Sequence, residues 1–323
     1  MKPAGQRSAN SDIPPGDPEV QRLLACLQSL VDGRSAIEEL AACGPRAIPA
    51  LREFLLSGRI TSVPQPRMWA VEALALLGAR AVLIEYLQSP SRGVDAQLQS
   101  AEDAVKNTAG RRLSAWRDNE TFEILLEFSR KRKLPGVIET IAEYERPEAI
   151  PCLDQALQDD MCRIAAEDGL RRLGPAARRA LVLSAVTPLP SADEETPSSL
   201  CRRRSALRLL TVIGVEPQSW EELRQLLAER DPELLARLAQ TTSSVANPGD
   251  RVAVAVGLVA ALGRMPWFVW KEAEEALVAL APESMPAIDA ELFRRSSKAP
   301  LARAADEVLR TLLRLKTMLR EVQ

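Results

Sequence analysis

The sequence contains no histidine among its 323 residues. This absence excludes Ser-His-Asp and Cys-His catalysis, metal binding through imidazole and pH switching through imidazole. Aromatic residues are also scarce, at 4% of the chain, so a core of large aromatic side chains is not expected. With 46% hydrophobic and 27% charged residues, the composition is typical of a soluble, folded protein.

The charge balance lacks a basic excess, because 42 Lys and Arg residues stand against 44 Asp and Glu residues. Nucleic-acid-binding domains usually carry a basic excess, so the balance argues against nucleic acid as the partner. Seven of the basic residues are Lys and 35 are Arg. Arginine is the residue best suited to paired hydrogen bonds with carboxylates.

Long apolar runs are missing as well. The longest, Val252–Leu262, is too short to span a bilayer and is interrupted by Gly257, so no membrane partner is expected. Residues 1–17 are rich in Pro, Gly, Ser and Asn and lack the apolar core of a secretory signal. This composition predicts a disordered N-terminal tail over residues 1–17.

The five cysteines are odd in number and include no C-x-x-C pair. This usage predicts a reduced, cytoplasmic compartment and argues against a zinc or iron–sulfur site. Neighbouring carboxylates such as Asp159 and Asp160 diverge on a helix and do not converge on a substrate. The sequence therefore predicts no catalytic residues, no metal and no cofactor.

A nine-residue window recurs along the chain. Each copy begins with Ala, has an aliphatic residue at position five and an apolar residue at position eight, and ends with Gly. The copies are Ala36–Gly44, Ala70–Gly78, Ala166–Gly174, Ala206–Gly214 and Ala255–Gly263, and Ala273–Ala281 lacks only the glycine. Positions one, five and eight share one helix face, and a final Gly in the left-handed conformation ends a helix. The window therefore predicts a helix followed by a sharp turn.

A second pattern, P-x-[AS]-[IM]-P-x-[LI]-x-x-x-L, occurs at Pro45–Leu55, Pro147–Leu157 and Pro282–Leu292. Proline is tolerated in the first helical turn, so this pattern predicts the start of a second helix. Before Pro147 the window Val137–Glu145 carries Glu145 where the closing glycine would stand, and we interpret it as a degenerate copy.

The two patterns together resemble HEAT-like repeats of the phycobilisome-lyase type over most of residues 20–295. The resemblance implies an all-α fold, an α-α superhelix of the armadillo/HEAT type with about six to seven degenerate helical-hairpin repeats. We expect this solenoid over residues 18–323, with a mobile insertion near 187–199 and a C-terminal helix over 299–322.

In such repeats the second helix of each unit lines a groove, and the resemblance therefore gives a set of candidate binding residues. They are Arg46, Arg52, Glu53, Glu148, Asp154, Gln155, Arg178, Arg179, Glu221, Arg224 and Gln225. Their mixed charge favours a protein or peptide partner over a polyphosphate. Trp267 and Trp270 are hot-spot candidates, because they share a helix face in the segment richest in aromatic residues.

Two basic clusters are further candidates for an acidic partner or for ordinary surface charge. Arg130–Lys133 ends a predicted helix, where positive charge is favourable. Arg202–Arg204 opens one, where it opposes the helix dipole, and we expect Asp193, Glu194 and Glu195 to neutralise it.

The sequence thus favours a non-catalytic scaffold or adaptor that binds a protein or peptide in its groove. One alternative is a bilin-lyase-like enzyme or chaperone, since phycobilin lyases have similar repeats. Another is a HEAT-like nucleic-acid-binding or DNA-repair protein, as among the alkylpurine glycosylases. The deoxyhypusine hydroxylases are excluded, because their di-iron centre depends on histidine.

Overall fold

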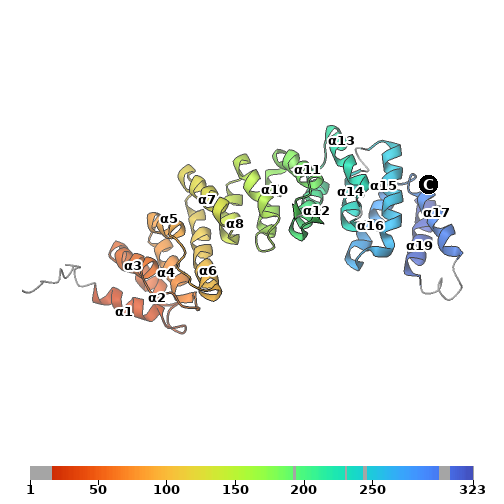
Figure 1. The fold of residues 1–323 in the computed structure, drawn as a ribbon. Coiled ribbons are helices and arrows are strands. Elements are labelled where there is room, and N and C mark those ends of the chain that lie inside the picture. Colours follow the sequence, from red (N-terminus) through yellow and green to blue (C-terminus); the bar gives the residue numbers. More distant parts are fainter. Residues whose placement is uncertain (1–16, 192–193, 230, 243–245, 298–305, 323) are drawn as a thin grey trace, which may run out of the picture. The chain divides into compact units, whose positions relative to one another are not determined.

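The computed structural model describes residues 17–191, 194–229, 231–242, 246–297 and 306–322. Within these ranges the chain is helical, apart from one antiparallel pair of two-residue strands, β1 (Pro190–Ser191) and β2 (Glu194–Glu195). The predicted all-α class is confirmed (Figure 1). The chain divides into two compact units, with the division between Tyr144 and Glu145. We call the N-terminal part unit 1 and the C-terminal part unit 2.

Unit 1 is built from α-helices joined by short turns and two 3-10 helices. The α-helices are α1 (Pro18–Leu27), α2 (Ala36–Ala42), α3 (Ile48–Leu56), α4 (Gln65–Leu76), α5 (Arg80–Gln88), α6 (Ala96–Arg112), α7 (Asn119–Lys131) and α8 (Pro135–Glu143). The 3-10 helices are η1 (Gly44–Ala47) and η2 (Leu113–Ala115). Asp17 caps α1 by accepting a hydrogen bond from the Glu19 N–H at 3.0 Å, and the predicted tail otherwise lies outside the described residues.

Unit 2 has the same character. Its described α-helices are α9 (Ile150–Ala156), α10 (Arg163–Leu173), α11 (Arg178–Val186), α12 (Pro197–Ile213), α13 (Trp220–Leu223), α14 (Pro232–Thr242), α15 (Pro248–Ala261), α16 (Trp267–Ala279), α17 (Met285–Ser296) and α19 (Glu307–Val322). Its 3-10 helices are η3 (Pro147–Ala149), η4 (Gly174–Ala177), η5 (Pro217–Ser219), η6 (Arg224–Ala228) and η7 (Leu262–Arg264).

Within each unit, helices that are two positions apart in chain order pack against each other, which sorts the helices into two layers. In unit 1, α2, α4, α6 and α8 contact one another in turn, and so do α1, α3, α5 and α7. In unit 2 the same order holds for α10, α12, α14, α16 and α19. In the other layer of unit 2, α9 contacts α11 and α11 contacts α13. The 3-10 helix η6 contacts α13 and α15, and α15 contacts α17. We call the layers that contain α2 and α10 the first layers, and those that contain α3 and α11 the second layers.

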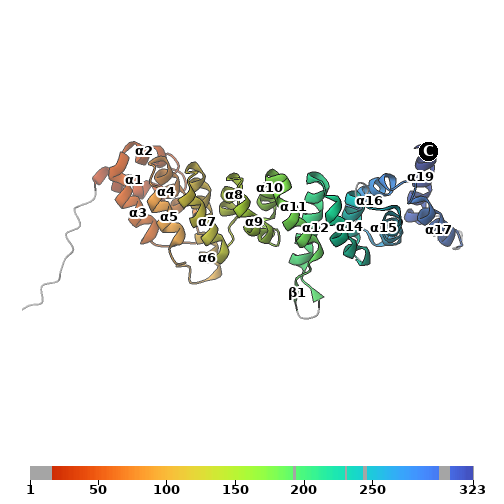
Figure 2. The same cartoon turned by 90° about the horizontal axis from the view of Figure 1, so that it is seen from above.

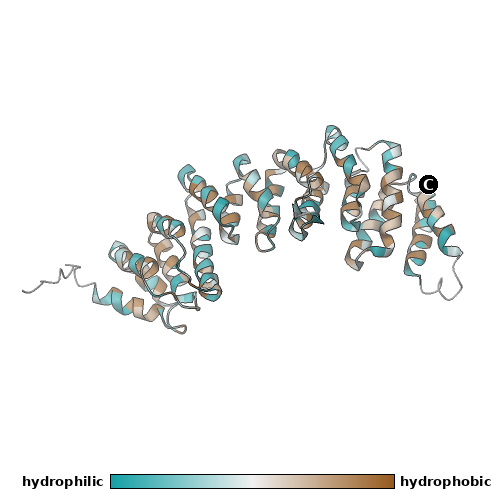
Figure 3. Ribbon diagram, viewed as in Figure 1, coloured by the Kyte–Doolittle hydropathy of each residue, from teal (hydrophilic) through white to brown (hydrophobic). Residues whose placement is uncertain are grey.

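Four copies of the recurring window lie in first-layer helices, and the fifth, Ala255–Gly263, lies in α15 and η7 of a second layer. Positions one and five are buried in every copy, as Ala166 (0% exposed) and Leu170 (0% exposed) illustrate. Position eight is only half-buried in four copies and is buried as Leu262 in the fifth. Each helix therefore shows an apolar side and a hydrophilic side (Figure 3).

Four of the five closing glycines have a positive φ, namely Gly44, Gly78, Gly174 and Gly214. At Gly174, φ is 54° and ψ is −126°, which lies outside the left-handed helical region. The reason is Pro175, because the residue before a proline avoids helical ψ angles. The prediction is wrong for Gly263, which lies inside the 3-10 helix η7. The helical turn continues there through Arg264 and ends before Met265.

The degenerate window keeps the turn without the glycine. Glu145 has a φ of 51°, and it is the one non-glycine residue with a positive φ among the described residues. Its side chain is exposed. The backbone at this turn therefore keeps the positive φ of the glycine turns, at a conformational cost that glycine would not have.

The paired prolines occupy the places that the second pattern predicts. Pro45 and Pro147 lie in 3-10 turns, while Pro49, Pro151 and Pro286 lie in the first turns of α3, α9 and α17. First-turn residues have no helical hydrogen-bond acceptor for their N–H groups, so proline removes nothing there.

Basic side chains from first-layer helices cap the ends of second-layer helices. Arg67 of α4 donates to the Leu55 carbonyl at 2.7 Å, and Lys106 of α6 donates to the Leu87 carbonyl at 3.3 Å. In unit 2, Arg163 of α10 donates to the Leu157 carbonyl at 3.0 Å, and Arg203 of α12 donates to the Ala185 carbonyl at 2.8 Å. The last carbonyls of α3, α5, α9 and α11 thereby gain hydrogen-bond donors from basic side chains, which are favourable near a helix C-terminus.

Two predicted segment boundaries differ from the structure. The last helix, α19, begins at Glu307 and not at residue 299, because Asp306 caps it by accepting from the Leu309 N–H at 3.1 Å. Residues 298–305 lie outside the described residues. The segment 187–199 ends earlier than predicted, since α12 begins at Pro197. Its strand pair precedes α12 in unit 2 (Figure 2), and its predicted mobility stays a prediction.

Candidate functional site

The predicted binding residues of unit 1 are partners in exposed ion pairs. Arg46 pairs with Asp17 and Glu19, each at 2.7 Å, and links η1 to the start of α1. Arg52 of α3 pairs with Glu85 of α5 through two hydrogen bonds. These bonds lower the pKa of the Glu85 carboxyl and raise that of the Arg52 guanidinium. Each pair joins neighbouring helices, so these two arginines act within the protein.

The predicted residues of unit 2 are distributed over several helices and do not meet. Glu148 pairs with Arg146 at 3.3 Å, and Arg178 pairs with Glu216 at 3.2 Å. Arg179 pairs with Glu222. Asp154 accepts a hydrogen bond from Ser184 and lies 3.7 Å from Arg202. Burial raises the pKa of the Asp154 carboxyl above its ordinary value, because its ionised form is poorly solvated there.

Arg224 belongs to a polar cluster that sequence reasoning missed. Its Nε donates to Asp250 Oδ1 at 3.0 Å, and Asp250 is 5% exposed. Trp220, 3% exposed, donates from Nε1 to Asp250 Oδ2 at 2.8 Å, and Asn247 Nδ2 donates to the same oxygen. The cluster ties α13 and η6 to α15. Its only sequence signal is a carboxylate 30 residues beyond a tryptophan.

The aromatic candidates have different environments. Trp270 is half-buried, and its Nε1 donates to the Met265 carbonyl at 3.0 Å. Phe268 is 56% exposed. The side chain of Trp267 lies outside the described residues. Among the described positions of this segment, Phe268 therefore offers more apolar surface than Trp270, which already uses its donor.

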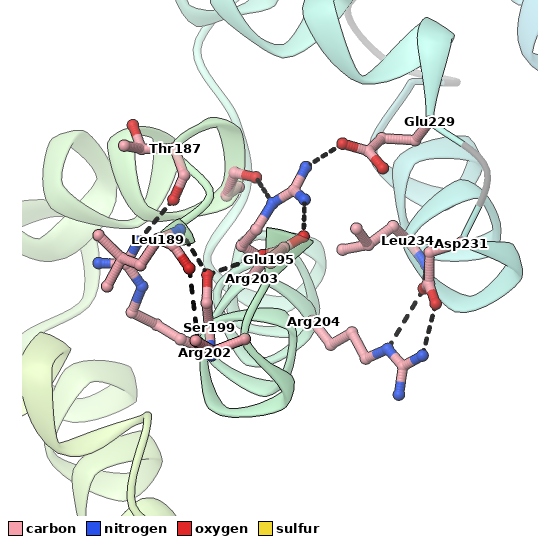
Figure 4. A network of polar contacts seen from close by, with 12 residues as sticks. Thr187, Leu189, Glu195, Ser199, Arg202, Arg203, Arg204, Glu229, Asp231 and Leu234 are labelled. Carbon is pink, nitrogen blue, oxygen red and sulfur yellow. Dashed lines mark hydrogen bonds and ion pairs between the residues drawn. The ribbon is translucent and has the colours of Figure 1, made fainter. Parts of the chain in front are cut away.

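The Arg202–Arg204 cluster is structural. Arg203, 1% exposed, donates to Glu195 at 2.7 Å and to Glu229, besides its bond to the Ala185 carbonyl (Figure 4). Arg204 pairs with Asp231. Neutralisation by the preceding acidic loop is thus confirmed for Glu195, whereas Glu194 is exposed and Asp193 lies outside the described residues.

The Arg130–Lys133 cluster splits between surface and interior. Arg130 and Lys131 both pair with Glu127 on the same helix, at 2.9 and 3.1 Å. Their proximity lowers the pKa of the Glu127 carboxyl. Arg132 instead turns to Asp103 of α6. No single face of unit 1 therefore collects the four charges of this cluster.

Two adjoining hollows on unit 1 form a groove. Its first part, of about 450 Å³, lies between α1 and α3 and has Leu24, Gln28, Glu53 and Phe54 in its walls. Its second part, of about 470 Å³, shares Gln28, Phe54 and Gly58 with the first and extends past Leu30 and Val63. The two hollows adjoin at these shared residues, and we call them together the α1–α3 groove.

The α1–α3 groove combines apolar and charged walls. Leu30 is 61% exposed and Val63 is 43% exposed, although both are strongly apolar. Glu53, Arg59 and Arg67 add both signs of charge to its walls. An apolar floor with polar edges of mixed sign suits an extended or helical segment of another protein. The groove lies beside second-layer helices, and its walls include Glu53 but none of the other predicted residues.

Metal and membrane features are not found in the described part of the chain. Over residues 17–191, 194–229, 231–242, 246–297 and 306–322, no three His, Cys, Asp or Glu side chains gather as metal ligands would. In the same residues no helix combines the length and apolar character that crossing a membrane requires. A scan against protein-family models matches no family, and a search of curated proteins returns no matching protein.

Proposed function

We propose that this chain is a HEAT-type α-solenoid that serves as a scaffold or adaptor and binds a segment of another protein in the α1–α3 groove. The two-layer helix order within each unit, with glycine turns and second-helix prolines at recurring positions, supports the solenoid. A cytoplasmic location belongs to the same proposal and rests on the unpaired spacing of the five cysteines.

The observation that carries the binding proposal is the exposed apolar surface in a hollow. The side chains of Leu30 and Val63 are exposed to solvent in the walls of the α1–α3 groove, which can hold several residues of a partner. Burying apolar surface stabilises a complex by about 25 cal/mol per Å² before the costs of association. The mixed charges of Glu53 and Arg59 would set the register of the bound segment without adding much affinity.

The test begins with peptides selected on the wild-type protein from a random library, whose affinity is then measured by fluorescence anisotropy. Leu30→Glu and Val63→Glu should each weaken binding more than about tenfold, which corresponds to about 1.4 kcal/mol. The matched control is Val94→Glu, because Val94 is 88% exposed in unit 1 and lies outside the groove walls. The fold should tolerate all three variants, since they are at exposed positions.

Hydrogen exchange locates the complex independently. A bound peptide should slow exchange in residues 21–30 and 50–67, which contain the groove walls. Equal affinity of all three variants, or protection confined to other helices, would refute the proposal. Salt-sensitive binding of duplex DNA would instead favour the nucleic-acid alternative. A visible absorption band after incubation with a bilin would favour the lyase-like alternative.

A further inference from the structure

A second hollow on unit 1 has a buried lysine in its wall. This pocket has a volume of about 390 Å³ and lies between α5, α6 and α7, away from the α1–α3 groove. Leu87, Ile124 and Phe128 give it an apolar side, and Ser89 and Ser91 contribute hydroxyls. Lys106 completes the wall, although its residue is only 4% exposed. The amine is therefore shielded from bulk water and still borders a space large enough for a small molecule.

The Lys106 Nζ has four tetrahedral positions, and one covalent bond and two hydrogen bonds account for three of them. Nζ carries Cε and donates to two carbonyl oxygens, those of Leu87 at 3.3 Å and of Ser89. The ring of Tyr86 is the nearest aromatic surface, with its centroid 5.7 Å from Nζ. Two acceptors satisfy both N–H groups of a neutral amine, whose lone pair then takes the fourth direction. The same two carbonyls satisfy only two of the three N–H groups of an ammonium ion.

Electrostatics around Lys106 also favours the neutral amine. Burial lowers the pKa of Lys106 from its ordinary value, because the ammonium ion loses hydration. Arg132 of α7 and Arg67 of α4 act in the same direction, while Glu102 and Asp103 of α6 oppose it. Glu102 is fully buried, and its Oε2 accepts the N–H groups of Arg92 and Gly93. The other charged residues at the pocket are Glu127 and Lys131, on the exposed side of α7.

We propose that Lys106 is a carbonyl-reactive amine and that its pocket takes a small apolar aldehyde or ketone as a reversible imine. The Nζ lone pair attacks the carbonyl carbon, the C=O π electrons move to oxygen, and the oxygen takes a proton from Nζ to give a carbinolamine. The carbinolamine hydroxyl then takes the second Nζ proton and leaves as water when the C–O bond breaks, and the Nζ electron pair forms the C=N bond. Leu87, Ile124 and Phe128 contact the apolar part of the ligand. The proposal is independent of the peptide groove.

The test compares all lysines of the wild-type protein in one sample. Hexanal and sodium cyanoborohydride at pH 7.5 convert each imine to a stable hexyl-lysine, which peptide mass spectrometry assigns to a residue. Lys106 should react about tenfold faster than Lys271 for each unit by which its pKa is lower. Lys271 is the control, because its side chain is 86% exposed. Reaction in order of exposure, with Lys106 last, would overturn the proposal.

Two further measurements test the role of the pocket. Replacing hexanal by the charged aldehyde glyoxylate should lower the ratio of Lys106 to Lys271 labelling, because the apolar side favours an alkyl chain; an unchanged ratio contradicts the apolar ligand class. Ile124→Gln should slow labelling at Lys106 and leave Lys271 unaffected, since Ile124 is half-buried in the pocket wall. Equal rates in the variant and the wild-type protein would show that the reaction does not use the pocket.

Discussion

The turn conformations predict opposite effects for two substitutions in unit 2. Gly174 has a positive φ with ψ at −126°, and a Cβ added there would meet no atom within 4 Å. The cost of Gly174→Ala is therefore entirely conformational. Glu145 already holds a positive φ of 51° with an exposed side chain, so Glu145→Gly removes backbone strain without removing packing.

The magnitudes follow from backbone energetics. Alanine in a region that is essentially restricted to glycine is strained by about 1–3 kcal/mol. It regains about 0.4–1 kcal/mol because it restricts the unfolded chain, so we expect Gly174→Ala to destabilise by about 1–2 kcal/mol. A non-glycine residue at positive φ costs about 1–2 kcal/mol, and Glu145→Gly should stabilise by about 0.5–1 kcal/mol after the same correction.

Urea unfolding followed by circular dichroism at 222 nm measures both effects as shifts of the midpoint. With a typical slope of about 1–3 kcal/mol per molar urea, the expected shifts are a few tenths of a molar or more. Glu145→Ala is the control, because it removes the same carboxylate but keeps a Cβ. If Gly174→Ala is neutral, or if Glu145→Gly is no more stable than Glu145→Ala, the backbone argument is wrong.

Three further substitutions test the buried polar groups. Arg203→Met should destabilise by about 3–5 kcal/mol in urea unfolding, because it leaves Glu195 and Glu229 without their cationic partner. Arg208→Met should cost under about 1 kcal/mol, because the Arg208 side chain is 48% exposed. Folding lowers the pKa of Lys106, so between that lowered pKa and 10.5 the folded protein binds fewer protons at Lys106 than the unfolded chain does. The free energy of unfolding should therefore rise with pH in this window. In Lys106→Met, the urea midpoints measured up to pH 10 should no longer show this rise. Trp220→Phe should cost about 1–3 kcal/mol and speed hydrogen exchange in α15, because one Asp250 oxygen loses its indole donor; unchanged exchange would speak against this coupling.

Local patterns made the helical architecture predictable. The window places Ala and aliphatic residues on one helix face and a glycine at the helix end. Both features depend only on local backbone conformation, so nine residues are enough to reveal them. The same logic failed at Gly263, where the residues that follow decide whether the helix ends or tightens into a 3-10 turn. It also did not predict the cap at Asp306, which lies inside a run with a helical pattern throughout.

The polar interactions were less predictable, because their partners lie about one repeat away. The nearby partner of Arg203, Glu195, was expected from the sequence. Its other partners, Glu229, 26 residues later, and the Ala185 carbonyl at the end of α11, were not. Arg52 and Glu85 are 33 residues apart. Pairing such residues from the sequence would require the exact repeat period, which is known only approximately. The α1–α3 groove was missed for the same reason, since its walls come from two helices and the turn beyond them.

The capping of second-layer helices by basic side chains bears on how such a chain could be lengthened. Each donor belongs to one helix pair and each acceptor to the pair before it, as Arg67 and Leu55 show in unit 1 and Arg163 and Leu157 in unit 2. Helix α2 follows the first helix and contains no basic residue. Duplication of a whole pair would therefore carry its own donor and acceptor with it. A gene that gained or lost such a pair would change the length of the protein without leaving a buried cation unpaired.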